Sequence, residues 1–143
     1  MKIESSHIIK APREKVWNAL MDPKVIAQCI PGCEDLKAVG PDEYEASVKI
    51  GIASITAVYK THIAIKDKNP PNHYVLSGGG SAGPGFVKGQ VTIDLEENNG
   101  QTLLKYSADA QLGGVIAGIG QRMLGGIAKM MVGEFFKKVE GFV

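Results

Sequence analysis

Apolar and polar residues alternate along much of the chain, and this two-residue period predicts a β-sheet. The alternation is clearest at Tyr44, Ala46, Val48 and Ile50. Asn98-Asn99-Gly100 favours a tight hairpin, because Asn-Gly tolerates positive φ. Short turns between consecutive strands predict an antiparallel meander. The predicted strands cover residues 2–10, 34–39, 44–51, 52–66, 74–80, 85–97 and 101–113.

Two parts of the chain follow helical patterns instead. Residues 11–20 predict a helix with Pro12 in its first turn and Asp22-Pro23 beyond its end, followed by one short turn at 24–28. The second pattern predicts a helix over residues 115–142, which would be about 42 Å long at 1.5 Å per residue. Its apolar positions recur at steps of three or four and fall on one arc: Ile116, Ile119, Met123, Ile127 and Met130.

One domain, residues 1–143, accounts for these elements, in an α+β arrangement with the long helix lying across one face of the sheet. The period of two predicts which side chains face the helix: Val48, Ile50, Val91, Ile93, Leu95, Leu104 and Tyr106. The chain has 18 glycines. In strand interiors they remove side-chain volume from the sheet face, and in the last helix each costs about 1 kcal/mol relative to alanine. This combination favours a cavity beneath a movable helix.

The densest glycine stretch, residues 78–85, contains the string G-x-G-x-x-G. A dinucleotide fingerprint must lead from a strand into a helix, whereas Pro84-Gly85 leads into another strand. The stretch therefore predicts a hairpin with bulges, and its order is left open.

Charge and composition exclude several classes of function. The formal net charge of +1 gives no reason to expect nucleic-acid binding. No apolar run is long enough to span a bilayer, and the N-terminus lacks the pattern of a signal peptide, so we expect a cytoplasmic protein. Cys29 and Cys33 have neither redox nor zinc spacing, which leaves free thiols and a disulfide both open.

Candidate catalytic groups are few. The three histidines lack the spacing of a metal site, and no nucleophile motif is present, so we expect no metal, no cofactor and no catalytic residue. An enzyme of this architecture would have to use Asp109, His62 or Tyr59. Asp109 could also accept hydrogen bonds from Lys88 or Arg122 at the mouth of a cavity.

Several short stretches along the chain form a recognisable set: IPGCE at 30–34, GSAG at 80–83 with FVKG at 86–89, YSAD at 106–109 with GG at 113–114, and IGQRML at 119–124. In these stretches the chain resembles the G-subunit family of carbon monoxide dehydrogenase, within the START and Bet v 1-like superfamily of polyketide cyclases and lipid-transport proteins. The A-P-x-x-x-V-W pattern at 11–17 is similar to the wider superfamily. The resemblance implies a helix-grip fold, in which a seven-stranded antiparallel sheet wraps around a long C-terminal helix and encloses an apolar cavity.

The resemblance also implies a partner, a molybdenum-containing carbon monoxide dehydrogenase or related hydroxylase. Relatives look like membrane-recruiting or quinone-handling accessory proteins. Many have a tail beyond the helix that reaches the membrane, whereas this chain ends at Val143, so only transient contact with the inner face of the membrane is expected.

The main hypothesis is thus the non-enzymatic binding of a quinone or lipid-like molecule. Its expected lining is Val48, Ile50, Phe86, Val91, Tyr106, Ile116, Ile119, Met123 and Ile127, with polar contacts from Lys88, Asp109 and Arg122 at the mouth. One alternative is an assembly or membrane-recruitment factor that needs no ligand. The other is a cyclase or hydratase of the same fold.

Overall fold

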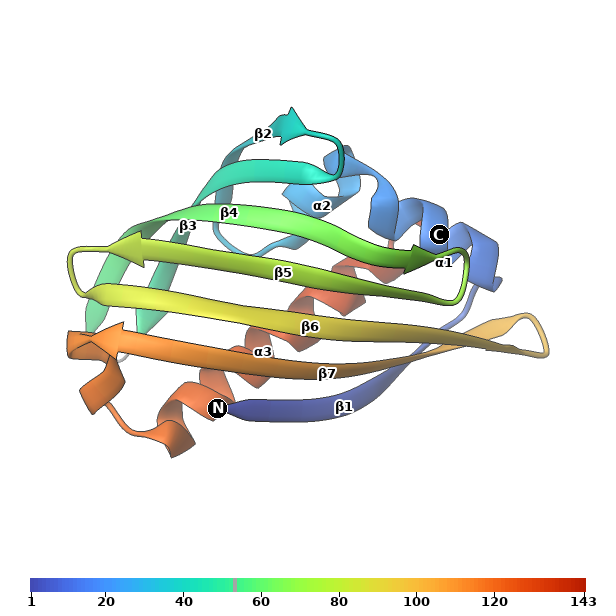
Figure 1. Ribbon diagram of the computed structural model, residues 1–143. Helices are drawn as coiled ribbons and strands as arrows, with labels where there is room; N and C mark the ends of the chain where they lie inside the picture. The colour runs from blue at the N-terminus through green and yellow to red at the C-terminus, as the bar shows by residue number, and fades with distance from the viewer. Residues whose placement is uncertain (53) are drawn as a thin grey trace.

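The computed structural model describes residues 1–52 and 54–143, and its strands form one seven-stranded antiparallel sheet (Figure 1). The strands are β1 (Lys2–Ile9), β2 (Cys33–Gly40), β3 (Glu43–Ile52), β4 (Ile55–Asn69), β5 (His73–Ala82), β6 (Gly85–Asn98) and β7 (Gln101–Gly114). Their order in the sheet is β1-β7-β6-β5-β4-β3-β2, which confirms the predicted meander for β2 to β7. β1 pairs with β7, at the opposite edge from β2. The predicted strand at 52–66 includes Ala53, which lies outside the described residues.

Two tight hairpins show how local sequence sets the register. Asn99 and Gly100 have φ values of 53° and 78°, and the flanking Asn98 and Gln101 pair directly, as in a two-residue hairpin with positive φ at both turn positions. The glycine-rich segment is also ordered: β5 and β6 pair without interruption from His73 with Asp94 to Ala82 with Gly85. The prediction of bulges in this hairpin is therefore wrong.

The N-terminal helical region forms two helices, α1 (Arg13–Met21) and α2 (Pro23–Cys29), where one helix and a short turn were predicted. Asp22 separates them and begins the second one. Its side chain accepts a hydrogen bond from the backbone N–H of Lys24 at 2.9 Å, and Pro23 occupies the first helical position. This is a favourable start for a helix, because the carboxylate pairs a donor that the helix leaves free.

The C-terminal helix is shorter than predicted. Residues Val115–Gly118 form a 3-10 turn, η1, and the α-helix α3 covers Gln121–Glu140. Gly120 precedes α3 with a φ of 108°, a conformation that an α-helix does not contain. The prediction of one continuous helix from residue 115 is therefore wrong, and the 20 residues of α3 extend over about 30 Å. In Figure 1 α3 crosses behind the sheet.

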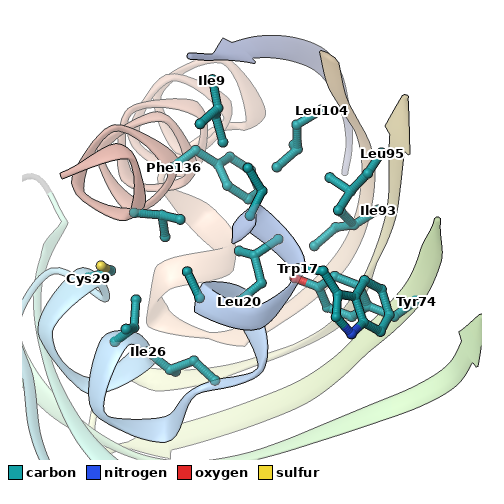
Figure 2. Packing of buried hydrophobic residues seen from close by; sticks show 14 of the residues in the cluster. Ile9, Trp17, Leu20, Ile26, Cys29, Tyr74, Ile93, Leu95, Leu104 and Phe136 are labelled. Carbon is teal, nitrogen blue, oxygen red and sulfur yellow. The ribbon is translucent and has the colours of Figure 1, made fainter. Parts of the chain in front are cut away.

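The main core lies at the end of the sheet covered by α1, α2 and the C-terminal half of α3 (Figure 2). Trp17 meets Tyr74 edge to face, with ring centroids 5.5 Å apart. Thr102 is fully buried and donates a hydrogen bond from Oγ1 to the backbone oxygen of Ala11 at 2.8 Å, which ties β7 to the start of α1. All seven residues predicted to face the helix lie on the inner face, the face of the sheet toward α3.

The two cysteines are free thiols, so the disulfide left open by their spacing is absent. Cys29 is buried and Cys33 is half-buried. Burial raises the pKa of both thiols, and for Cys33 the nearby charges of Asp35 and Glu34 raise it further. Both side chains are therefore protonated at neutral pH and poorly nucleophilic.

Candidate functional site

The buried core of the inner face is interrupted in the middle of the sheet. One cluster, described above, includes Ile93 and Leu104. The second lies at the other end and consists of Ile52, Tyr59, Ile116 and Leu124. Between them, Gly78, Gly89 and Ala110 pair across β5, β6 and β7, and we call these three residues the small-residue row. All three are half-buried, so the row supplies almost no side-chain volume to fill the space in front of it.

The middle of α3 shows the same interruption from the opposite side. Steps of four residues advance only about 40° around a helix, so Leu124, Ala128, Val132 and Phe136 share one face. Leu124 and Phe136 are buried, each against a different cluster. Ala128 and Val132, which lie between them, are only half-buried. A Cβ built on the neighbouring Gly125 would meet no atom within 4 Å. Helix and sheet are therefore not tightly packed at this point.

The arc of α3 that faces the sheet is not the apolar arc that the sequence predicted. Met123 and Met130 are 51% and 57% exposed, so the expectation that they face the sheet is wrong. The turn at Gly120 separates η1 from α3, so the helical phase of Ile116 and Ile119 cannot be extended into α3. The inward face follows Leu124 instead, about 100° from Met123. Residues 124, 128, 132 and 136 were detectable as a series at steps of four, which sequence analysis missed.

The predicted lining residues separate into two groups by location. Seven residues lie on the inner side. Val48 is buried there, and the other six lie in or against the two clusters: Ile50, Val91, Tyr106, Ile116, Ile119 and Ile127. Phe86 and Met123 do not: Phe86 is 48% exposed and lies on the outer face of the sheet, the face away from α3. Phe86 and Val91 are five positions apart in one strand, and an odd spacing places two side chains on opposite faces.

The predicted polar contacts do not gather at the edge of the inner face. Lys88 and Asp109 lie on the outer face, and Arg122 is exposed in the first turn of α3. Lys88 and Asp109 point outward because successive side chains of a strand alternate between the two faces. Lys88 lies between the inward-facing Val87 and Gly89, and Asp109 lies between Ala108 and Ala110.

A groove of about 1020 Å³ lies on the outer face, over β2 to β7. Its lining is mainly polar and includes Glu45, Ser47, Lys60, His62, Ser77, Ser81, Lys88, Gln90, Asp109 and Gln111, with Gly79 in the middle. Sequence analysis missed this groove. Its residues come from six strands, and only the cross-strand register brings them together.

The three groups that could serve an enzyme are not collected in one place. His62 and Asp109 line the outer groove on β4 and β7. Tyr59 lies on the inner face and is 2% exposed, within the second cluster. A reaction between helix and sheet would therefore have only the Tyr59 hydroxyl from this set. Among the described residues, no group of three histidine, cysteine or carboxylate side chains could hold a metal ion.

Tyr74 is the notable polar group of the main core. It is 1% exposed, and its hydroxyl oxygen has no hydrogen-bond partner among the described residues. Burial raises its pKa far above the ordinary value, so it is a neutral donor. Figure 2 shows the oxygen directed toward Leu20, inside the core. An unpaired buried hydroxyl costs about 1–3 kcal/mol.

Tyr74→Phe is accordingly expected to stabilise the unliganded protein by about 1 kcal/mol, because it removes the unpaired oxygen and keeps the edge-to-face contact with Trp17. In a thermal melt this corresponds to a rise in Tm of about 3 °C. Tyr44→Phe on the same inner face is the control and should not raise Tm. A lower Tm for Tyr74→Phe would mean that the hydroxyl is paired in solution.

Comparison with known proteins supports the family resemblance found in the sequence. Residues 6–142 match the family model described as the G-subunit of carbon monoxide dehydrogenase (CoxG). A conserved protein from Geobacillus kaustophilus is 43% identical, with a TM-score of 0.94 over 99% of this chain and 93% of that one. No curated protein sequence matches the chain.

More distant structures share the fold alone. A START superfamily protein from Mycobacterium smegmatis is 15% identical, with a TM-score of 0.73 over 98% of this chain and 94% of that one. The Zhui aromatase/cyclase from a Streptomyces species is also 15% identical, with a TM-score of 0.65 over 99% and 92%. The seven-stranded sheet with its C-terminal helix is thus a START and Bet v 1-like helix-grip fold.

Proposed function

Because this chain belongs to the G-subunit (CoxG) family of carbon monoxide dehydrogenase, we propose that it binds an apolar small molecule between α3 and the inner face of the sheet, without catalysing a reaction. A quinone or another lipid-like molecule is the proposed ligand. The same proposal includes an accessory role toward a molybdenum-containing carbon monoxide dehydrogenase or related hydroxylase. The family's name supports that role.

The observation that supports ligand binding most directly is the interruption of the core. Two apolar clusters lie at the ends of the inner face, and the small-residue row separates them. Apolar groups that face this region, such as Val91, Ala128 and Val132, remain half-buried. A ligand that covered them would gain about 25 cal/mol per Å² of apolar surface removed from water.

Binding is tested with the purified protein in two steps. First, solvent extraction and mass spectrometry should detect an apolar molecule that co-purifies. Second, a soluble quinone with a short side chain should bind with 1:1 stoichiometry and displace an apolar fluorescent probe. Absence of both a co-purified molecule and quinone binding would overturn the proposal.

A second candidate function is docking without a ligand, as an assembly factor or a factor that recruits the enzyme to the inner face of the membrane. Three exposed apolar side chains in η1 and α3 favour it: Val115, Met123 and Met130 are 66%, 51% and 57% exposed. Within the described residues, no helix has the length and apolarity needed to cross a bilayer. Transient contact with the membrane surface is part of this second candidate.

The two candidates predict different effects of Met123→Ser/Met130→Ser. If the exposed methionines serve docking, this variant should lose capture of the molybdenum enzyme or binding to vesicles, and any quinone binding should equal that of the unsubstituted protein. If the protein is only a ligand carrier, the variant should keep its affinity for quinone and show no change in enzyme capture. Quinone binding and enzyme capture are therefore measured on the same preparation.

A further inference from the structure

The outer groove is organised around β5, in the middle of the sheet (Figure 1). Within the groove, the outward positions of this strand are Ser77, Gly79 and Ser81, all small, and they form the floor. The neighbouring strands carry larger side chains at the paired positions. His62 and Lys88 flank Gly79, while Lys60 and Phe86 flank Ser81. Successive outward residues in a strand are about 7 Å apart, so the floor extends over about 14 Å.

The walls next to this floor are cationic. Lys60 and Lys88 are exposed, and in the described part of the chain neither forms an ion pair. The ammonium group of Lys60 donates only to Ser47 Oγ, at 3.1 Å. Two of the acidic lining residues, Glu45 and Asp109, lie one strand further out on either side, across from His62 and Gln90. The third, Asp35, lies on β2, two strands from Lys60. The floor around Gly79 therefore has unpaired positive charge on both sides and serine hydroxyls at both ends.

An aromatic platform adjoins this positive region. Phe86 pairs with Gly113 on β7, and a Cβ at Gly113 would overlap the Phe86 ring. The ring therefore lies against the backbone of β7, where glycine leaves room for it. Phe86 is 48% exposed, an unusual state for a phenylalanine in a strand, and it borders the groove one side-chain repeat away from Gly79.

From this arrangement we propose that the outer groove binds a small organic phosphate that carries a planar ring, of the size of a mononucleotide. The phosphate lies over Gly79 between Lys60 and Lys88, and the serine hydroxyls donate to its oxygens. The ring lies on Phe86. The positions over Gly79 and over Phe86 are separated by one side-chain repeat, about 7 Å. A ring with its anionic group attached directly is too short to occupy both positions, whereas a sugar between ring and phosphate matches this separation. The site is independent of the ligand proposed for the inner face.

The test uses the full chain and three probes: adenosine monophosphate, adenosine and inorganic phosphate. Amide chemical shifts are followed by NMR during titration. Adenosine monophosphate should shift the amides of Gly79 and Ser81 and bind at least fivefold more tightly than either of the other probes. Absence of shifts in the groove at millimolar probe, or equal binding of all three, would overturn the proposal.

Variants then locate the contacts. Lys60→Gln/Lys88→Gln should weaken binding of adenosine monophosphate at least tenfold. Lys66→Gln is the matched control, because Lys66 occupies the same side of β4 outside the groove, and it should change affinity less than twofold. Phe86→Ser should reduce binding of adenosine monophosphate to the level of inorganic phosphate. All these side chains are exposed, and an unchanged Tm verifies folding. Equal losses in the lysine variant and its control would overturn the proposed site.

Discussion

Gly125→Leu is expected to weaken the binding of an apolar ligand about tenfold or more while the protein stays folded. Gly125 is half-buried beside the inward face of α3, and a Cβ there would meet no atom within 4 Å. A leucine would extend into the region that we assign to the ligand. Loss of roughly 60 Å² of apolar contact, at about 25 cal/mol per Å², corresponds to about 1.5 kcal/mol, or a factor of about ten in Kd.

Gly126→Leu is the matched control for this prediction. Gly126 is the next residue of the same helix, it is exposed, and a Cβ on it would also meet nothing within 4 Å. Both variants gain helix propensity, on the order of 0.5–1 kcal/mol, so any effect on helix stability is shared. Only the leucine at 125 should reduce quinone affinity, measured by displacement of the fluorescent probe.

The outcome separates two descriptions of the interior. If Gly125→Leu and Gly126→Leu bind quinone equally well, the ligand does not lie under the middle of α3. If Gly125→Leu fails to fold, the region is too tightly packed to accept a side chain, and a ligand would not fit there either. A thermal melt of both variants is therefore recorded before binding is measured.

Phe136→Ala is expected to lower the free energy of unfolding by about 4 kcal/mol. Phe136 is 2% exposed and belongs to the main core, where its ring centroid lies 5.4 Å from that of Tyr106 on β7 and 5.2 Å from that of Phe135. The substitution removes these aromatic contacts and leaves a cavity between α3 and the sheet. Domains of this size are stable by only about 5–15 kcal/mol, so a large part of the stability would be lost.

Urea unfolding followed by circular dichroism measures this loss as a lower midpoint. Phe142→Ala is the control, since Phe142 follows α3 and is 46% exposed, and we expect a change of about 0.5 kcal/mol or less. An equally small effect for Phe136→Ala would show that the C-terminal half of α3 is not anchored by this ring.

Local patterns were sufficient for much of the fold. The seven strands follow from alternation and turn residues, because both depend on near neighbours in the chain. The Asn99-Gly100 turn is an example: its positive φ values are a property of the residue types. The inner face was also predictable, since Ile93 and Leu95 are buried in the positions that the period of two assigns to them.

The candidate site was only partly predictable. Seven of the nine expected lining residues lie on the inner side, but Met123 and Phe86 do not. Periodicity alone could not choose between two apolar arcs on α3, because both recur at helical spacing. The φ of 108° at Gly120 sets the phase of the helix, and contacts with the sheet determine which arc is buried.

The sequence by itself determined the succession of strands along the chain, the face of the sheet that is apolar and the family to which the chain belongs, because each depends on short-range patterns or on stretches of matching residues. Only the tertiary structure decided where α3 begins, which of its arcs is buried and how the outer groove is formed. The groove unites Lys60, Gly79 and Lys88 from three strands. Their proximity depends on cross-strand register, which is a property of the assembled sheet rather than of any one segment.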